Sequence, residues 1–336
     1  MSPLPTHKIG TTDVTAVGYG AMGLSAFYGK PKPDEERLAF LDALYESGCT
    51  NWDSADAYLD SEDLLGKWFK KSGKRNEIFL ATKCGFTGNP THMINGEPEY
   101  IKAACERSLK RLGVDSIDLY YLHRPDLTVP IERSVGAMAE LVKEGKVKYI
   151  GLSEASANDI RRAHAVHPIG AYQVEYSPFC LDIESEELGI LKTCRELGIA
   201  VVAYSPLGRG MLTGKYSGPE DFEEGDFRLT IPKYSKENFP KINAIADKMK
   251  AIGSKYGVEA SAVCLAWVLA QGEDIIPIPG TTRISNLREN LSALTFKLTA
   301  QELEDINVAV KAANFPEGTR YNQAFLSFSF VDTPSL

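Results

Sequence analysis

Short apolar runs alternate along the chain with longer segments whose apolar residues recur at helical spacing. The short runs are rich in β-branched and aromatic residues, which is typical of strands. We expect eight strands, near Ala16–Gly20, Cys49–Asp53, Glu77–Thr82, Ile117–Leu122, Lys148–Leu152, Ala171–Glu175, Ile199–Tyr204 and Ile275–Ile278. Regular alternation of strands and helices favours parallel pairing of the strands.

Glycine marks the ends of most of the helical segments. In the segment 98–112, Ile101, Cys105 and Leu109 share one face, and Gly113 follows the segment. Glycine ends a helix because it enters the left-handed conformation at little cost. The other expected helices are Asp34–Ser47, Ser61–Lys71, Ile131–Glu144, Glu184–Leu197, Asn238–Tyr256 and Glu259–Ala270.

This order of elements predicts one α/β domain over residues 1–336, folded as a closed (β/α)8 barrel. An open, doubly wound sheet is the alternative. A hairpin is expected before the barrel, with strands at Lys8-Ile9 and Val14-Thr15 around the turn Gly10–Asp13. Residues 206–240 are rich in glycine, proline and charge, and we interpret them as a long loop. In a barrel of this kind, functional side chains lie at the carboxyl ends of the strands.

A glycine motif near the amino end requires a choice between folds. Gly18-Tyr-Gly20-Ala-Met-Gly23 matches the dinucleotide-binding pattern G-x-G-x-x-G and follows an expected strand. In a Rossmann fold, a helix begins at these glycines and its amino terminus faces the pyrophosphate. Because Pro31 and Pro33 follow the motif, we expect no helix before about Asp34. We therefore reject the Rossmann interpretation.

Composition and charge narrow the class of protein. The 336 residues are 43% hydrophobic and 24% charged, which excludes a disordered or collagen-like chain. The net charge of −8 disfavours a nucleic-acid-binding protein. No apolar run is long enough for a signal peptide or a membrane span, and the six cysteines form no C-x-x-C pair. We expect a cytoplasmic protein without a metal site.

Four residue types with complementary chemistry follow three consecutive strands. Asp53 ends the second expected strand and Tyr58 follows it, Lys83 follows the third strand and His123 follows the fourth. Each residue alone has an ordinary structural explanation, such as a helix cap or a solvated charge. In a barrel, however, these strand ends are neighbours on one rim. A lysine beside the apolar residues Leu80-Ala81 also needs a counter-charge, which an aspartate supplies.

At these residues the chain resembles the aldo-keto reductase superfamily, over about 8–303. The motifs that carry the resemblance are Trp52-Asp-Ser-Ala-Asp-Ala-Tyr58, Ala81-Thr-Lys83, Tyr121-Leu-His123, Gly151-Leu-Ser-Glu154, Gln173-Val-Glu-Tyr176, Ala203-Tyr-Ser-Pro-Leu-Gly208, Ile278-Pro-Gly-Thr-Thr-Arg283 and Leu287-Arg-Glu-Asn290. Residues 151–168 and 266–272 look like the branch that holds fungal and plant reductases of the perakine-reductase type. The resemblance implies a (β/α)8 barrel with an amino-terminal hairpin and a long loop over the cofactor. It also implies NADPH or NADP+ and a carbonyl substrate.

By the same resemblance, Tyr58 would donate a proton to the carbonyl oxygen that receives the hydride. The Lys83 ammonium would lower the pKa of Tyr58, and Asp53 would hold Lys83 in place. His123 would hydrogen-bond the carbonyl oxygen and orient it.

The resemblance also implies a set of cofactor-binding residues. Tyr204 would stack on the nicotinamide, while Ser153, Glu154 and Gln173 would bind its carboxamide. The pyrophosphate would contact Ser205, Leu207, Gly208 and Arg209. Thr281, Thr282 and Arg283, after Gly280, would hold the 2′-phosphate, and Glu289 and Asn290 would face the adenine. Three positions depart from the family pattern: Glu154 where many members have asparagine, Gly280 where many have lysine, and Leu59 where many have glycine.

The substrate is less defined by the sequence. Leu24, Phe27, Tyr28, Phe86, Arg124, Tyr321 and the tail at about 313–336 could line an apolar pocket. Pyridoxal or a natural-product ketone are alternative substrates for the same chemistry. A different class of function is an NADPH-sensing regulatory subunit with slow turnover. We expect a monomer or a weak homo-oligomer.

Overall fold

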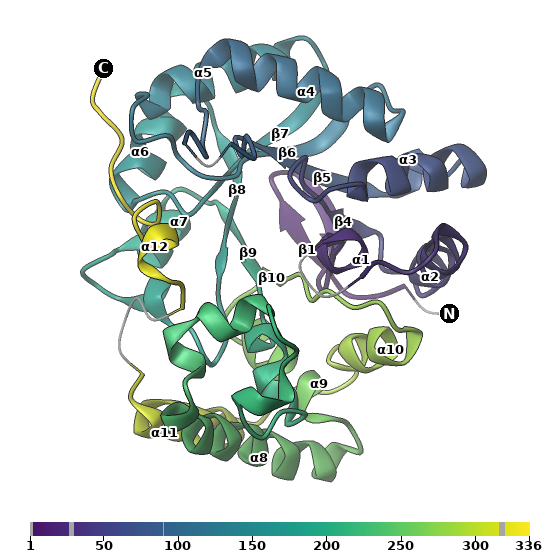
Figure 1. The fold of residues 1–336 in the computed structure, drawn as a ribbon, viewed down its shortest axis with the longest axis vertical. Coiled ribbons are helices and arrows are strands. Elements are labelled where there is room, and N and C mark those ends of the chain that lie inside the picture. The colour runs from purple at the N-terminus through teal and green to yellow at the C-terminus, as the bar shows by residue number, and fades with distance from the viewer. Residues whose placement is uncertain (1–2, 27–29, 90, 316–319) are drawn as a thin grey trace.

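The computed structural model describes residues 3–26, 30–89, 91–315 and 320–336. Its core is an eight-stranded sheet in chain order, with parallel pairs throughout. The strands are β3 (Tyr19–Gly20), β4 (Asn51–Asp53), β5 (Phe79–Cys84), β6 (Ile117–Leu122), β7 (Val147–Ser153), β8 (Ile169–Glu175), β9 (Ala200–Tyr204) and β10 (Ile275–Pro277). Each of the eight overlaps an expected strand. Helices surround the sheet (Figure 1), so the fold is the predicted α/β barrel.

Backbone hydrogen bonds close the barrel between its first and last strands. The Gly18 N–H donates to Pro277 O at 2.9 Å, and the Gly20 N–H donates to Pro279 O at 3.4 Å. An added Cβ at Gly18 would lie 2.8 Å from Asn51 Nδ2, and one at Gly20 would lie 2.9 Å from Ile278 O. The first two glycines of the motif therefore permit close contact between strands.

The third glycine of that motif lies in α1 (Met22–Ser25), a helix of a single turn. Our expectation that no helix begins before Asp34 is therefore wrong by this one turn. Ala26 is extended, so the helix ends after four residues.

The hairpin closes the amino-terminal end of the barrel. It consists of β1 (Thr6–Ile9) and β2 (Thr12–Thr15), longer than expected, with Gly10 in the left-handed region at a φ of 56°. Ile9 and Val14 pack against inward-facing residues of the barrel strands, including Phe79 and Ala81. The described residues thus fill the interior at this end, which leaves the other end of the barrel for a ligand.

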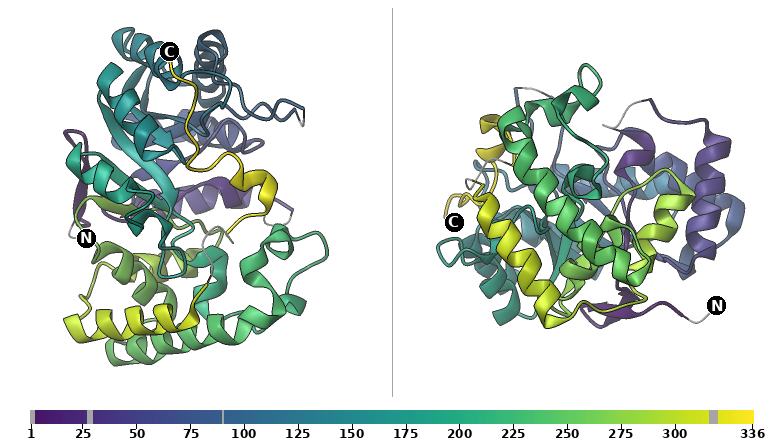
Figure 2. Two further views of the ribbon diagram at one scale, coloured as in Figure 1. Left: turned by 90° about the vertical axis from the view of Figure 1, so that its left-hand side faces the viewer. Right: turned by 90° about the horizontal axis from the view of Figure 1, so that it is seen from below.

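The outer layer consists of helices in chain order. These are α2 (Asp34–Glu46), α3 (Ser61–Ser72), α4 (Pro98–Leu112), α5 (Ile131–Lys143), α6 (Ala157–Val166), α7 (Ile190–Glu196), α8 (Phe239–Tyr256), α9 (Ala260–Leu269), α10 (Ile284–Ser292), α11 (Ala300–Ala313) and α12 (Gln323–Leu326). Helix α7 is half the expected length, because the 3-10 turn at Asp182–Glu184 and the left-handed Gly189 precede it. Figure 2 shows α8 and α11 side by side at the base of the molecule. No helix of the described residues is long and apolar enough to cross a membrane.

Two further segments shape the open end of the barrel. After β9, the chain runs through the 3-10 helices Gly208–Thr213, Pro219–Asp221, Phe227–Thr230, Pro232–Tyr234 and Lys236–Asn238. The carboxyl-terminal tail runs from α12 along the side of the barrel to α5 and α6 (Figure 2). There the Thr333 N–H donates to Asp159 Oδ2 at 2.9 Å, and Arg162 Nη1 donates to Thr333 O at 3.0 Å. The carboxyl-terminal end of this tail segment is therefore fixed to α6.

Candidate active site

The structure brings the four predicted residues together at the open end of the barrel. Asp53 ends β4, Lys83 lies in β5, and His123 directly follows β6. Tyr58 lies in the loop between β4 and α3, whose backbone is fixed by hydrogen bonds from Ser54 N to Ala81 O and from Asp56 N to Lys83 O. The loop thus returns Tyr58 to the strand end that carries Lys83.

Lys83 is fully buried and has a complete set of partners. Its ammonium forms an ion pair with Asp53 and donates to Ser54 O at 2.5 Å. The other carboxylate oxygen of Asp53 accepts a hydrogen bond of 2.7 Å from Gln173 Nε2. The Tyr58 hydroxyl lies 3.5 Å from Lys83 Nζ. A buried charge of this kind is stable only when it is paired and hydrogen-bonded.

Burial and the Lys83 charge act in opposite directions on the pKa of Tyr58. Burial raises the pKa of Tyr58 above its ordinary value, and the nearby Lys83 ammonium only reduces that increase. Lys83 thus lowers the pKa of Tyr58 as predicted, but desolvation outweighs its charge and the net pKa is raised. Burial opposes the charged form of Lys83, but Asp53 and Tyr58 leave its pKa raised.

His123 is neutral in this environment. Burial, and then the charges of Lys83 and Arg124, lower its pKa well below the usual value. The edge of its ring meets the Tyr58 ring at 5.8 Å and the Phe86 ring at 4.7 Å between centroids. Its Nδ1 has no hydrogen-bond partner among the described residues. A neutral imidazole in this position can hydrogen-bond a polar group that enters the cavity.

A cavity of about 1870 Å³ extends from these side chains to α10. Among the predicted site residues, those that line it are Asp53, Tyr58, Phe86, His123, Arg124, Ser153, Gln173, Tyr204, Ser205, Leu207, Arg209, Gly280, Thr281, Thr282, Arg283, Glu289 and Tyr321. Lys83, Glu154, Gly208 and Asn290 do not line it. Leu24 belongs to the hydrophobic core, so its assignment to the substrate pocket is wrong. Phe27 and Tyr28 lie outside the described residues.

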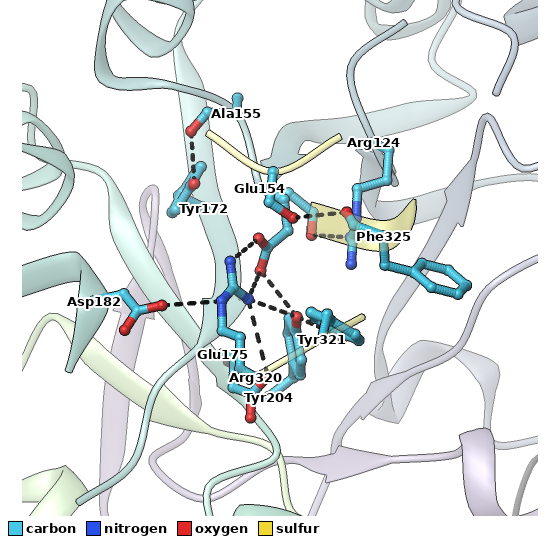
Figure 3. Close-up of polar contacts among 12 residues, drawn as sticks. Arg124, Glu154, Ala155, Tyr172, Glu175, Asp182, Tyr204, Arg320, Tyr321 and Phe325 are labelled. Atoms are coloured by element: carbon cyan, nitrogen blue, oxygen red, sulfur yellow. Dashed lines mark hydrogen bonds and ion pairs between the residues drawn. The ribbon is translucent and has the colours of Figure 1, made fainter. Parts of the chain in front are cut away.

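Glu154 belongs to a buried charge cluster (Figure 3). Arg320 donates to both of its carboxylate oxygens, at 2.9 and 2.6 Å, and the Tyr204 hydroxyl donates at 2.9 Å. Burial raises the pKa of Glu154, but the charges of Arg320 and Arg124 outweigh it and bring the pKa to about 2. The carboxylate that we expected to face a carboxamide is therefore ionised and bound to the protein itself.

Arg209 is also bound by groups of the protein itself. Its Nη2 forms an ion pair of 2.9 Å with Glu175, and its Nη1 donates to Arg320 O at 3.0 Å. Its guanidinium also lies over the Tyr321 ring, 4.6 Å from the centroid. A pyrophosphate contact from Arg209 would have to share a guanidinium that already neutralises Glu175.

The far end of the cavity fits a phosphate group. Thr281, Thr282 and Arg283 precede α10, and the Thr281 hydroxyl accepts a hydrogen bond of 3.2 Å from the Arg283 N–H. Arg283 is exposed and forms no ion pair with any described residue. The positive end of the α10 dipole points toward the same region. A large cavity with a phosphate site at one end and aromatic and polar groups at the other fits a phosphorylated dinucleotide.

Sequence reasoning missed Arg320, Glu175 and Asp56. Arg320 and Glu175 complete the charge cluster, and burial raises the pKa of the cavity-lining Asp56 to about 7, with Glu62 adding to the increase. Asp56 could have been found because it lies between Asp53 and Tyr58. No sequence signal pointed to Arg320, since its partner Glu154 is 166 positions away.

The described residues contain no group of His, Cys, Asp and Glu side chains that could hold a metal ion.

Comparisons with known proteins agree with this geometry. The model of the aldo/keto reductase family matches residues 16–311. The chain is 53% identical to an aldo-keto reductase of Strobilurus tenacellus, over 99% of both chains. It is 49% identical to an aldo-keto reductase of Schizosaccharomyces pombe named as an NADP(+) enzyme, over 99% of both chains, and 43% identical to a probable aldo-keto reductase of Glycine max, over 97% of this chain and 95% of that one.

Solved structures also match the fold of this chain. The glycerol dehydrogenase of Gluconobacter oxydans matches with a TM-score of 0.83 and 28% identity, over 94% of this chain and 98% of that chain. A thermostable aldo-keto reductase in complex with the inhibitor epalrestat matches with a TM-score of 0.73 and 28% identity, over 91% of this chain and all of that one.

Proposed function

Because this chain belongs to the aldo/keto reductase family, we propose that it uses NADPH to reduce an aldehyde or a ketone to an alcohol. The observation that carries the proposal is the buried Lys83–Asp53 pair beneath Tyr58 and His123, at the floor of a cavity that is large enough for a dinucleotide. A proton donor and a neutral hydrogen-bond donor face the same space there. The site is built to stabilise a carbonyl oxygen as negative charge develops on it.

In this proposal, NADPH supplies the hydride, and the protein supplies the proton and the orientation. Tyr58 donates its hydroxyl proton to the carbonyl oxygen. The Lys83 ammonium, 3.5 Å from that hydroxyl, stabilises the phenolate that remains. Asp53 and Ser54 O fix the ammonium, and Gln173 fixes Asp53. His123 orients the carbonyl oxygen, because its neutral ring can donate a hydrogen bond without a competing charge.

The residues that would hold the cofactor follow the cavity from its floor to α10. Tyr204 would carry the nicotinamide ring, and Ser153 and Gln173 would face the carboxamide. Ser205 and Leu207 would contact the pyrophosphate. Arg283, Thr281 and Thr282 would bind the 2′-phosphate, since a guanidinium fork and a helix amino terminus both favour phosphate.

The test is the loss of reduced-nicotinamide absorbance when purified protein is mixed with NADPH and para-nitrobenzaldehyde. We expect steady turnover over many catalytic cycles. The Tyr58→Phe variant should lose about 100-fold or more in kcat, because it cannot donate the proton. Its affinity for NADPH, measured by fluorescence titration, should remain within about twofold of the wild type.

Two results would contradict the proposal. If Tyr58→Phe reduced the aldehyde at the wild-type rate, Tyr58 would not be the proton donor. If the wild type bound NADPH but turned over no more than once with a panel of aldehydes that includes pyridoxal, the protein would be an NADPH sensor instead.

A further inference from the structure

Arg124 is a buried cation beside the catalytic residues, and the proposed mechanism does not use it. It follows His123, its side chain is only 7% exposed, and it lines the cavity. Its Nη1 donates to His123 O at 2.7 Å and to Ser153 Oγ at 3.2 Å. The Nε and Nη2 groups make no hydrogen bond, and the guanidinium forms no ion pair, within the described part of the chain.

The carboxylate that attracts Arg124, that of Glu154, is already bound by another arginine. Glu154 attracts the Arg124 guanidinium from a distance, but both Glu154 oxygens accept hydrogen bonds from Arg320. In Figure 3, the Arg124 side chain lies apart from the Glu154–Arg320 pair and extends toward the tail that carries Tyr321 and Phe325. Arg320 also pairs with Asp182 at 3.1 Å and Glu175 at 3.9 Å, and Arg209 pairs with Glu175. The carboxylates of this cluster are therefore held by other arginines, and Arg124 forms no ion pair with a described residue. Such a buried charge is costly unless a partner completes it.

The surroundings of Arg124 favour a planar partner. The Phe86 ring lies 6.0 Å from the guanidinium carbon, and Tyr321 and Phe325 line the cavity on the tail side. A flat group that enters here meets aromatic surfaces and a guanidinium fork. A carboxylate matches that fork, because it can accept two parallel hydrogen bonds.

Arg124 is also close enough to the reaction centre to contact the same small molecule as Tyr58. The Phe86 ring lies 4.7 Å from the His123 ring and 6.0 Å from the Arg124 guanidinium carbon, and the His123 ring lies 5.8 Å from the Tyr58 ring. Arg124 and His123 are also adjacent in the chain. A substrate with its carbonyl at Tyr58 could therefore present an acidic group to Arg124.

We propose that Arg124 binds a carboxylate of the substrate, so that the protein prefers aromatic or other planar aldehydes and ketones that carry a carboxylate near the carbonyl group. This inference rests on the proposed function and names the substrate class of that site. Arg124 acts in binding and orientation, and the proton transfer remains with Tyr58.

The test compares para- and meta-carboxybenzaldehyde with their uncharged methyl esters. The wild type should prefer one of the acids over its ester by about 10- to 100-fold in kcat/KM, the range expected for a hydrogen bond between charged groups. Arg124→Gln should remove this preference, mainly through a higher KM for the acid, and change the ester by less than about threefold. Arg124→Lys keeps the positive charge but loses the forked guanidinium, so its preference for the acid should lie between those of the wild type and Arg124→Gln.

A binding measurement separates this inference from the proposed function. Calorimetric titration of the acid and the ester into protein saturated with NADP+ involves no turnover. The wild type should bind the acid more tightly, and Arg124→Gln should bind both alike. The matched control is Arg133→Gln, which removes an exposed arginine of α5 that pairs with Glu97 and does not line the cavity. This control should leave the acid-to-ester ratio unchanged.

The outcomes are distinct. Equal treatment of acid and ester by the wild type, in both kinetics and calorimetry, would overturn the inference. The inference would also fail if Arg124→Gln or Arg124→Lys lowered kcat/KM for the acids and for the esters by the same factor. If the wild type bound the acid through Arg124 but reduced neither compound, the carboxylate site would stand and the reductase proposal would fall.

Discussion

Lys83 keeps its charge inside the barrel because Asp53 and Ser54 O pair with it there. Tyr58 is therefore next to a permanent positive charge, yet burial still raises its pKa above the ordinary value. A raised pKa keeps the hydroxyl protonated through neutral and mildly alkaline pH, which suits a proton donor. The ammonium contributes mainly after the proton has left, when it faces a phenolate.

Arg283 carries a prediction of its own. It is exposed and free of ion pairs with described residues at the start of α10, so a 2′-phosphate would gain a bidentate partner there. Arg283→Ala should weaken NADPH binding by about 10-fold or more and change NADH binding by less than about twofold. Fluorescence titration with each cofactor measures this difference. Equal losses for NADPH and NADH would exclude Arg283 as the 2′-phosphate ligand.

At the scale of elements, the carboxyl-terminal tail contributes a wall of the cavity. Arg320 joins it to Glu154 at one end, and Thr333 joins it to Asp159 at the other. Between these anchors, the Tyr321 hydroxyl meets the Tyr204 hydroxyl at 2.9 Å. The buried ion pair therefore fixes the tail against the strand ends that carry the site.

Breaking this pair should destabilise the protein. Arg320 is 2% exposed, and Glu154→Gln would leave it with Asp182 at 3.1 Å and Glu175 at 3.9 Å as its remaining carboxylates. We expect a loss of about 3 kcal/mol in the free energy of unfolding, measured with urea, at the lower end of the range for a broken buried pair. Lys8→Gln breaks the exposed Lys8–Asp13 pair and should cost less than about 1 kcal/mol.

The effect of Glu154→Gln should depend on pH in a defined direction. The pKa of Glu154 is about 2 in the folded protein and about 4.3 in an unfolded chain. The stability from the carboxylate is thus fully present above the unfolded value and disappears as the pH falls toward 2. A stability difference between wild type and variant that stayed constant from pH 6 down to about pH 2.5 would contradict this assignment.

At the scale of the whole molecule, closure of the barrel depends on close backbone contact between β3 and β10. A Cβ added at Gly20 would lie 2.9 Å from the Ile278 carbonyl oxygen, so a side chain does not fit there without movement. The same closure brings α10 beside the other strand ends, so the phosphate-binding segment and the catalytic residues share one cavity.

Gly20→Ala tests this closure. The added Cβ would lie 2.9 Å from a backbone oxygen, so the strands would have to separate, at a cost of about 1–3 kcal/mol in unfolding free energy. The control is Gly136→Ala, in α5, where no atom lies within 4 Å of the added Cβ. That change should stabilise the protein by about 0.5–1 kcal/mol, because alanine favours the helix. Urea unfolding of both variants measures the contrast, and a neutral Gly20→Ala would show that the closure can relax.

The sequence determined the strands, most helices and the positions of Asp53, Tyr58, Lys83 and His123, because periodicity and strand ends are local properties of the chain. The sequence did not predict the one-turn helix α1 or the short length of α7, because neighbouring segments determine where these helices begin and end. Only the tertiary structure decided the partners of Glu154 and Arg209. Arg320 meets both residues from the tail, and burial in the folded barrel then fixes which charges pair and which one, at Arg124, still faces the cavity.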